Sequence, residues 1–167
     1  MQTKQPTPRI PFIQILENDR PQAMAWVTGG SQAPQLSGLV KFYDTPYGGV
    51  LIEAELFGLP NIQTQGSTDF YAMHIHDAGD CSRNFTMTGE HYNPGMQPHP
   101  YHAGDLLPLL GNQGYAWEAF YDKRFRISDI IGRSLVIHEK RDNFTSQPSG
   151  DAGTKIGCGV IMRANIS

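Results

Sequence analysis

Six histidines are the residues best suited to chemistry in this chain, and all of them lie between positions 74 and 138. Two of them, His74 and His76, flank Ile75. In an extended strand, alternate side chains point to the same face, so this pair is placed to chelate one ion. For an isolated His-x-His pair, two unrelated histidines are the alternative interpretation. The four further histidines favour a metal site.

Further along the chain, the histidines offer ligands for a second ion. His91, His99, His102 and Asp105 bring imidazoles and one carboxylate, a set suited to a closed tetrahedral zinc site. A polar, solvated loop is the alternative for this stretch. His138 ends an apolar run, where a lone histidine is more often a core or edge residue than a ligand. Taken alone, it is weak support for a metal site.

The elements that must position these residues have the composition of β-strands. Seven short segments are mostly apolar, contain β-branched or aromatic residues and are bounded by Gly, Pro, Asn or Asp. This pattern predicts an all-β sandwich or barrel. The segments are Ala23–Val27, Leu36–Tyr43, Val50–Phe57, Phe70–Ile75, Tyr115–Phe120, Ser134–His138 and Cys158–Met162.

The segment 50–57 shows the clearest strand pattern. An apolar face alternates with a more polar one, as in a half-buried strand. A turn at 44–49 with one Pro and two Gly precedes it, so we expect residues 36–57 to form a β-hairpin. The apolar face comprises Val50, Ile52, Ala54 and Leu56, and the second face comprises Leu51, Glu53, Glu55 and Phe57.

Between Ile75 and Tyr115 there is no convincing strand or helix, and this stretch is far longer than an ordinary loop. Ordering a chain costs roughly 1 to 2 kcal/mol of conformational entropy per residue. The few apolar side chains of the stretch cannot offset that cost alone. The loop must therefore be disordered or held by cross-links.

The composition indicates one compact domain without a nucleic-acid or membrane partner. The chain has 167 residues, a net charge of -3 and an isoelectric point near 6.0, so it has no basic surplus for a phosphate backbone. No apolar run approaches the ~20 residues that span a bilayer. The first residues lack the apolar centre of a signal peptide, which predicts a cytoplasmic protein unless a leader has been removed.

Residues 1–22 are expected to be an N-terminal extension ahead of a domain at 23–167. Four prolines interrupt the extension, which predicts an extended arm. Its apolar side chains are expected to dock on the body of the protein. They are Ile10, Phe12, Ile13, Ile15 and Leu16.

A series of motifs occurs in a fixed order from about Ala23 to Met162. Taken together, they resemble the copper/zinc superoxide dismutase family, and more closely its bacterial branch. That family implies a Greek-key antiparallel β-barrel or sandwich with two long loops forming the metal site. The motifs are His74-Ile-His76, Gly79-Asp80-Cys81, His91-Tyr-Asn-Pro94, His99, His102-Ala-Gly-Asp105, Ile131-Gly-Arg-Ser-Leu-Val-Ile-His138-Glu-Lys, Gly150-Asp-Ala-Gly153 and Cys158-Gly-Val-Ile161.

The resemblance implies two metal sites that share one imidazole. His74, His76, His91 and His138 would hold copper, and His91, His99, His102 and Asp105 would hold zinc. Cu(II) favours tetragonal imidazole coordination, whereas Zn(II) accepts tetrahedral nitrogen and oxygen donors. Loss of both ring protons from the bridging His91 is feasible between two dications.

Four further residues take roles by resemblance. Asp142 would hydrogen-bond His74 and His99 and fix their tautomers; a solvated loop aspartate is the alternative. Cys81 and Cys158 match the disulfide of the family, with two buried thiols as the alternative. Lys155 stands where the family usually has an arginine, so we expect it to attract an anion but orient it less well. A solvent-facing lysine without a role is the alternative.

The loop after His138 is short, since sixteen residues separate it from Lys155. Steering of an anion would then rely on Lys155, Lys140 or Arg141.

The resemblance implies an enzyme that converts superoxide to dioxygen and hydrogen peroxide, and it leaves room for a homodimer. The main alternative is a non-catalytic protein of the same fold that stores or transfers copper. A third is a zinc-stapled β-domain that acts as an interaction module.

Overall fold

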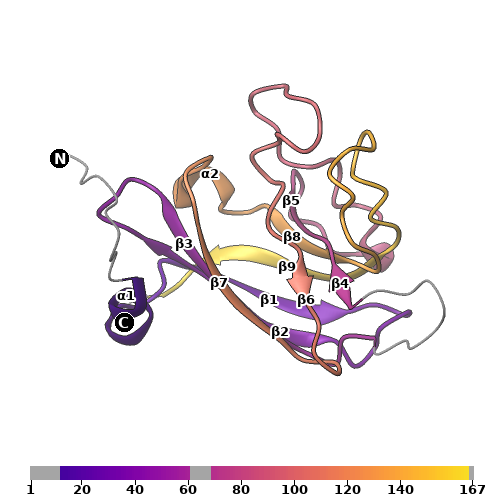
Figure 1. Cartoon of the computed structure of the whole chain (residues 1–167), viewed down its shortest axis with the longest axis horizontal. Helices are drawn as coiled ribbons and strands as arrows, with labels where there is room; N and C mark the ends of the chain where they lie inside the picture. The colour runs from indigo at the N-terminus through magenta and orange to yellow at the C-terminus, as the bar shows by residue number, and fades with distance from the viewer. Residues whose placement is uncertain (1–11, 61–68, 166–167) are drawn as a thin grey trace.

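The computed structural model describes residues 12–60 and 69–165. One curved sheet of seven strands has the order β5-β8-β9-β1-β2-β3-β7, and β4 pairs with β6 in a second, two-stranded sheet (Figure 1). The elements are α1 (Phe12–Asn18), β1 (Ala23–Gly29), β2 (Ser37–Asp44), β3 (Val50–Phe57), β4 (Phe70–Tyr71), β5 (Met73–His76), η1 (Arg83–Phe85), β6 (Leu109–Leu110), β7 (Ala116–Asp122), α2 (Ile127–Ile130), β8 (Ser134–His138) and β9 (Lys155–Arg163).

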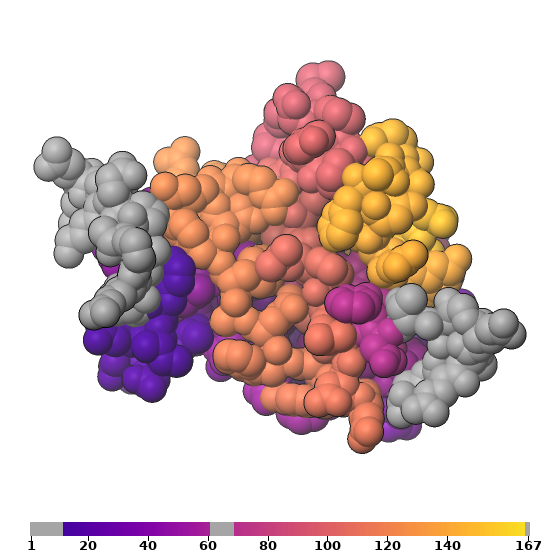
Figure 2. Space-filling view, viewed as in Figure 1, coloured from indigo at the N-terminus to yellow at the C-terminus, as the bar shows by residue number. Residues whose placement is uncertain are grey.

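Every described strand pair is antiparallel. Strands β1, β2 and β3 follow one another, and β9 returns to lie beside β1, which is Greek-key order. The predicted all-β Greek-key architecture is confirmed. The two long loops, 77–105 and 139–154, lie at the same end of the molecule above β5 and β8 (Figures 1 and 2).

The predicted hairpin forms from β2 and β3. Ser37 pairs with Phe57, and Asp44 pairs with Val50. The four residues of the predicted apolar face are buried, and their inward side chains join one hydrophobic core with residues from β1, β5, β8 and β9. Leu51 belongs to the opposite face but is also buried, because α1 covers it.

The N-terminal segment differs from the extended arm that the sequence predicts. Residues Phe12–Asn18 form α1, whose apolar residues Phe12, Ile15 and Leu16 have the i, i+3, i+4 spacing of one helical face. That face packs against Tyr43 and Leu51, so docking is confirmed for these three residues. Ile13 points away and is 60% exposed, and Ile10 lies outside the described residues.

Two further details depart from the sequence expectation. The segment predicted as one strand at 70–75 divides between β4 and β5, because Ala72 exchanges backbone hydrogen bonds with His138 and Lys140 rather than continuing beside β6. The short helix α2 was not predicted. Neither α2 nor α1 is long and apolar enough to cross a membrane, and the same holds for every helix in the described ranges.

An acidic side chain lies on the inner face of the edge strand β7. Glu118 pairs with the buried Ala54 across β3, which places both on the same face of the sheet. Its Oε1 is buried without a hydrogen-bond partner among residues 12–60 and 69–165. Burial raises the pKa of Glu118 to about 7. An inward-pointing charge of this kind discourages a sheet edge from pairing with another chain.

The raised pKa of Glu118 predicts that the folded state loses stability as the pH rises. An exposed glutamate ionises near 4.5, so between that pH and about 7 the folded state binds more protons than the unfolded one. We expect Glu118→Gln to raise the free energy of unfolding by roughly 1 to 3 kcal/mol at pH 8 and by much less at pH 5. Urea unfolding at both pH values measures this. An equal effect at both would contradict the assignment.

Candidate metal centre

Strand β5 carries the His-x-His pair in the predicted orientation. Its residues Met73 and Ile75 face the main hydrophobic core. His74 and His76 project from the other face, toward the long loops, and both are buried. The alternation of the strand therefore separates the core from the site.

The structure brings the four residues expected at the copper site together. One nitrogen from each lies within 4.8 Å of the corresponding atoms of the others, and all four side chains are buried. His76 Nε2 and His138 Nε2 are 3.3 Å apart. The group comprises His74, His76, His91 and His138.

The four residues expected at the zinc site form a second group with the same spread of ligand atoms. Asp105 Oδ1 lies 2.7 Å from His91 Nδ1 and 3.2 Å from His102 Nδ1. His99 Nδ1 comes within 3.1 Å of Asp105 Oδ2, without the alignment of a hydrogen bond. All four side chains are buried.

His91 belongs to both groups. Its Nδ1 faces Asp105 and His102 in the second group. Its Nε2 is buried without a hydrogen-bond partner in the described part of the chain, and the His91 ring lies 4.0 Å from the His74 ring, centroid to centroid. Each ring nitrogen of His91 therefore faces a different ligand group.

The nitrogens that face away from the two groups have hydrogen-bond partners. Asp142 accepts one bond from His74 Nε2 and one from His99 Nε2, each 2.8 Å long. His76 Nδ1 donates to the Gly89 carbonyl, and His138 Nδ1 donates to the Gly153 carbonyl. These bonds fix ring orientation and direct the remaining nitrogen of each ring into a ligand group.

Asp142 has room for this because residue 150 is a glycine. A Cβ at Gly150 would lie 1.9 Å from Asp142 Oδ1 and 2.7 Å from His99 Nε2. The carboxylate also accepts a bond from the Phe144 backbone. Burial alone would raise the pKa of Asp142, but the bonds from His74 and His99 hold it at about 2. The carboxylate therefore stays charged.

Three histidines of the first group are held as neutral imidazoles. Burial lowers the pKa of His74 to about 4, of His76 to about 2 and of His138 to about 3. Neutral imidazole keeps a nitrogen lone pair for a metal.

Orphaned nitrogens show that the residues fit metal ions. His74 Nδ1, His91 Nε2 and His99 Nδ1 are buried without partners within residues 12–60 and 69–165. A buried polar atom without a partner costs roughly 1 to 3 kcal/mol. Copper and zinc cations are suitable partners for these nitrogens, since imidazole binds both metals.

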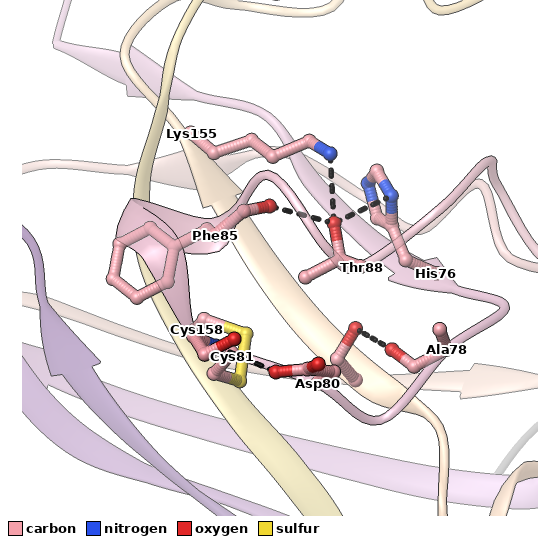
Figure 3. Close-up of a disulfide and its surroundings, with 10 residues drawn as sticks. His76, Ala78, Asp80, Cys81, Phe85, Thr88, Lys155 and Cys158 are labelled. Carbon is pink, nitrogen blue, oxygen red and sulfur yellow. Dashed lines mark hydrogen bonds between the residues drawn. A yellow bond between two sulfur atoms is a disulfide. The ribbon is translucent and has the colours of Figure 1, made fainter.

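A disulfide joins the loop after β5 to strand β9. Cys81 and Cys158 are bonded, with their Cα atoms 5.8 Å apart, as the resemblance implies (Figure 3). Phe85 of η1 packs with Cys158 and Val136 beside it. The bond therefore supplies one of the cross-links that the long loop requires.

Lys155 begins β9 beside the first ligand group. Its Nζ donates a 2.7 Å hydrogen bond to Thr88 Oγ1, and its side chain is half-buried rather than fully solvated. Lys140 and Arg141 are exposed on the adjoining loop. Sequence reasoning did not single out Thr88 or the carbonyls of Gly89 and Gly153, since a loop threonine and backbone oxygens carry no distinctive spacing.

The comparison with protein families decides the relationship. Residues 36–161 match the family described as copper/zinc superoxide dismutase (SODC). The chain belongs to the copper/zinc superoxide dismutase family. The two histidine groups are compatible with the copper and zinc sites of that family.

The chain is similar to both enzymes and copper chaperones. It is 33% identical over 141 residues to the extracellular superoxide dismutase (Cu-Zn) of Rattus norvegicus, covering 79% of this chain and 57% of that protein. It is 31% identical over 156 residues to the copper chaperone for superoxide dismutase of Sus scrofa, covering 86% of this chain and 54% of that protein. It is 30% identical over 156 residues to superoxide dismutase (Cu-Zn) 3 of Arabidopsis thaliana, covering 84% of this chain and 89% of that protein. The chain thus spans little more than half the length of the first two.

The position of Asp142 between the two groups predicts a loss of metal affinity when its charge is removed. We expect Asp142→Asn to weaken binding of both copper and zinc by roughly 10-fold to 100-fold, because the amide keeps only one acceptor oxygen and no charge to orient His74 and His99. Competition with a chelator of known affinity measures each constant. Asp151→Asn, at an exposed aspartate of the same loop, is the control and should bind both metals normally. Equal affinities in both variants would contradict this role.

Proposed function

We propose that this protein is a superoxide dismutase, which converts superoxide to dioxygen and hydrogen peroxide at a copper site bridged to zinc. One observation carries the proposal: each ring nitrogen of His91 faces one of two buried ligand groups. A single structural ion would not require this arrangement. The copper ligands would be His74, His76, His91 and His138, and the zinc ligands His91, His99, His102 and Asp105.

In the proposed reaction, copper supplies one-electron redox chemistry and zinc supplies a fixed positive charge. One superoxide gives up an electron and leaves as dioxygen. A second takes up that electron and two protons and leaves as hydrogen peroxide. His91 Nε2 would hold one of these protons in one half of the cycle and release it to the peroxide in the other. The hydrogen bonds of Asp142 would keep His74 and His99 oriented throughout.

Lys155 would attract the superoxide anion. The protein carries a net charge of -3, so approach of an anion depends on local positive charge. Lys155 lies close enough to the first group to disfavour protonation of His76 and His138. The exposed Lys140 and Arg141 would add to the attraction over a longer range.

A second candidate function is storage or transfer of copper without catalysis. The similarity to the copper chaperone of Sus scrofa favours it, as does the lysine at the position of the usual arginine. The third candidate, a zinc-stapled interaction module, requires only the second ligand group. It predicts that stoichiometric copper does not bind and that His74→Ala leaves the function intact.

The branch of the family and the oligomeric state are also proposals. The short loop at 142–153 supports membership of the bacterial branch, whereas the relatives described above are eukaryotic. We further propose that the protein forms a homodimer.

Activity and metal content together test the proposed function. We expect about one copper and one zinc per chain by elemental analysis, and dismutase activity in the loaded protein. Lys155→Arg should remain active. Lys155→Ala should lower kcat/KM by roughly tenfold and weaken its dependence on salt, because a charge near the site is lost. Lys123→Arg, at an exposed lysine after β7, is the control and should match the parent.

Two results would contradict the proposal. Bound copper without activity in both the parent and Lys155→Arg would favour copper storage. A protein that never binds stoichiometric copper would favour the zinc-stapled module.

A further inference from the structure

Thr88 connects the anion-attracting lysine to the first ligand group. Its side chain is fully buried, although threonine is polar and the residue lies in a loop. We propose that Thr88 is a positioning residue that holds the Lys155 ammonium in place to receive a small anion. The inference rests on the proposed function in one respect, since superoxide would be that anion.

The hydrogen bonds of Thr88 leave its hydroxyl little freedom. Oγ1 donates to the Phe85 carbonyl at 3.1 Å and accepts from Lys155 Nζ at 2.7 Å, and His76 Nδ1 lies 3.5 Å away (Figure 3). A hydroxyl has one proton and two lone pairs. Because the proton is committed to Phe85, a lone pair remains directed at Lys155. The ammonium has three N–H groups, so two stay available to an anion.

A lysine needs such an anchor more than an arginine does. The ammonium is a compact charge on a flexible four-carbon stem, whereas the guanidinium is a rigid fork that can bond protein and ligand simultaneously. An untethered Lys155 would therefore attract an anion without fixing its position. The hydrogen bond to the Thr88 hydroxyl holds the ammonium in one place. It thereby restores part of the control over anion orientation that is lost when lysine stands in place of the usual arginine.

The loop that carries Thr88 is itself fixed to the strand that carries Lys155. The Cys81–Cys158 disulfide joins the two segments, and Cys158 is three residues beyond Lys155 on β9. Ala78 also donates a backbone hydrogen bond to the Thr88 carbonyl at 2.9 Å. The disulfide and the hydrogen bond from Lys155 to Thr88 thus join the loop to β9 at two places (Figure 3).

The test compares variants of the full copper- and zinc-loaded chain. Thr88→Val removes the hydroxyl at nearly constant volume, and Thr88→Ser keeps it. Thr88→Ala serves as a second deletion if the valine variant does not fold or load metals. Thr86→Val is the matched control, because Thr86 lies in the same loop, is exposed and donates its hydroxyl hydrogen bond to the Arg83 carbonyl. Lys155→Ala and Thr88→Val with Lys155→Ala complete a double-mutant cycle.

Two readouts do not require turnover. The first is the dissociation constant of azide, a small anionic probe, from visible absorption of the copper-loaded protein. The second is the rate at which an amine-acetylating reagent modifies Lys155 at fixed pH, followed by peptide mass spectrometry. We expect Thr88→Val to weaken azide binding about tenfold, which is about 1.4 kcal/mol. Acetylation of Lys155 should become about threefold faster. Thr88→Ser and Thr86→Val should resemble the parent in both.

The cycle separates Lys155 from His76 as the residue through which Thr88 acts. We expect Thr88→Val to have no further effect on azide affinity once Lys155 is alanine. A persisting effect would show that Thr88 acts through His76 and would overturn the proposal. Parent-like azide affinity and acetylation in Thr88→Val would overturn it as well. If both readouts change as expected but no variant has dismutase activity, the positioning role stands and the proposed function fails.

Discussion

The concentration of buried imidazoles and carboxylates in one place is the constraint on which the rest of this structure depends. Six histidines, Asp105 and Asp142 are buried, and three histidine nitrogens have no hydrogen-bond partner in the described ranges. Burial lowers the pKa values of His74, His76 and His138 and keeps these three imidazoles neutral. Such an arrangement is costly in an apolar interior unless cations complete it. Two cations that share His91, as proposed, would give all three nitrogens a partner.

The same constraint accounts for the long loops. Residues 77–105 and 139–154 contain little regular structure, yet they lie against each other over β5 and β8 (Figure 1). Their fixed points are the disulfide, the hydrogen bonds of Asp142 to both histidine groups, and the ligands themselves. Metal binding and the ordering of the loops should therefore be coupled thermodynamically. A change that weakens metal affinity should also lower the stability of the loops.

The sequence predicts the sheet better than the details of the site. Alternation at 50–57 and the turn at 44–49 are local signals, so the hairpin and its faces were predictable. The histidine clustering indicated metal, whereas the sharing of His91 followed only from the family resemblance. Thr88 was missed because a single loop threonine has no periodic signal.

The helix at 12–18 was missed because neighbouring prolines obscured its i, i+3, i+4 pattern. The burial of Glu118 depends on long-range pairing of β7 with β3.

The most direct test of the central claim is a crystal structure of the copper- and zinc-loaded protein, with anomalous scattering recorded at the absorption edge of each metal. The account predicts zinc bonded to His91 Nδ1 at about 2.0 to 2.1 Å and copper bonded to His91 Nε2. A structure in which His91 is bonded to only one metal would contradict it. So would a structure in which both metals are held entirely by other residues.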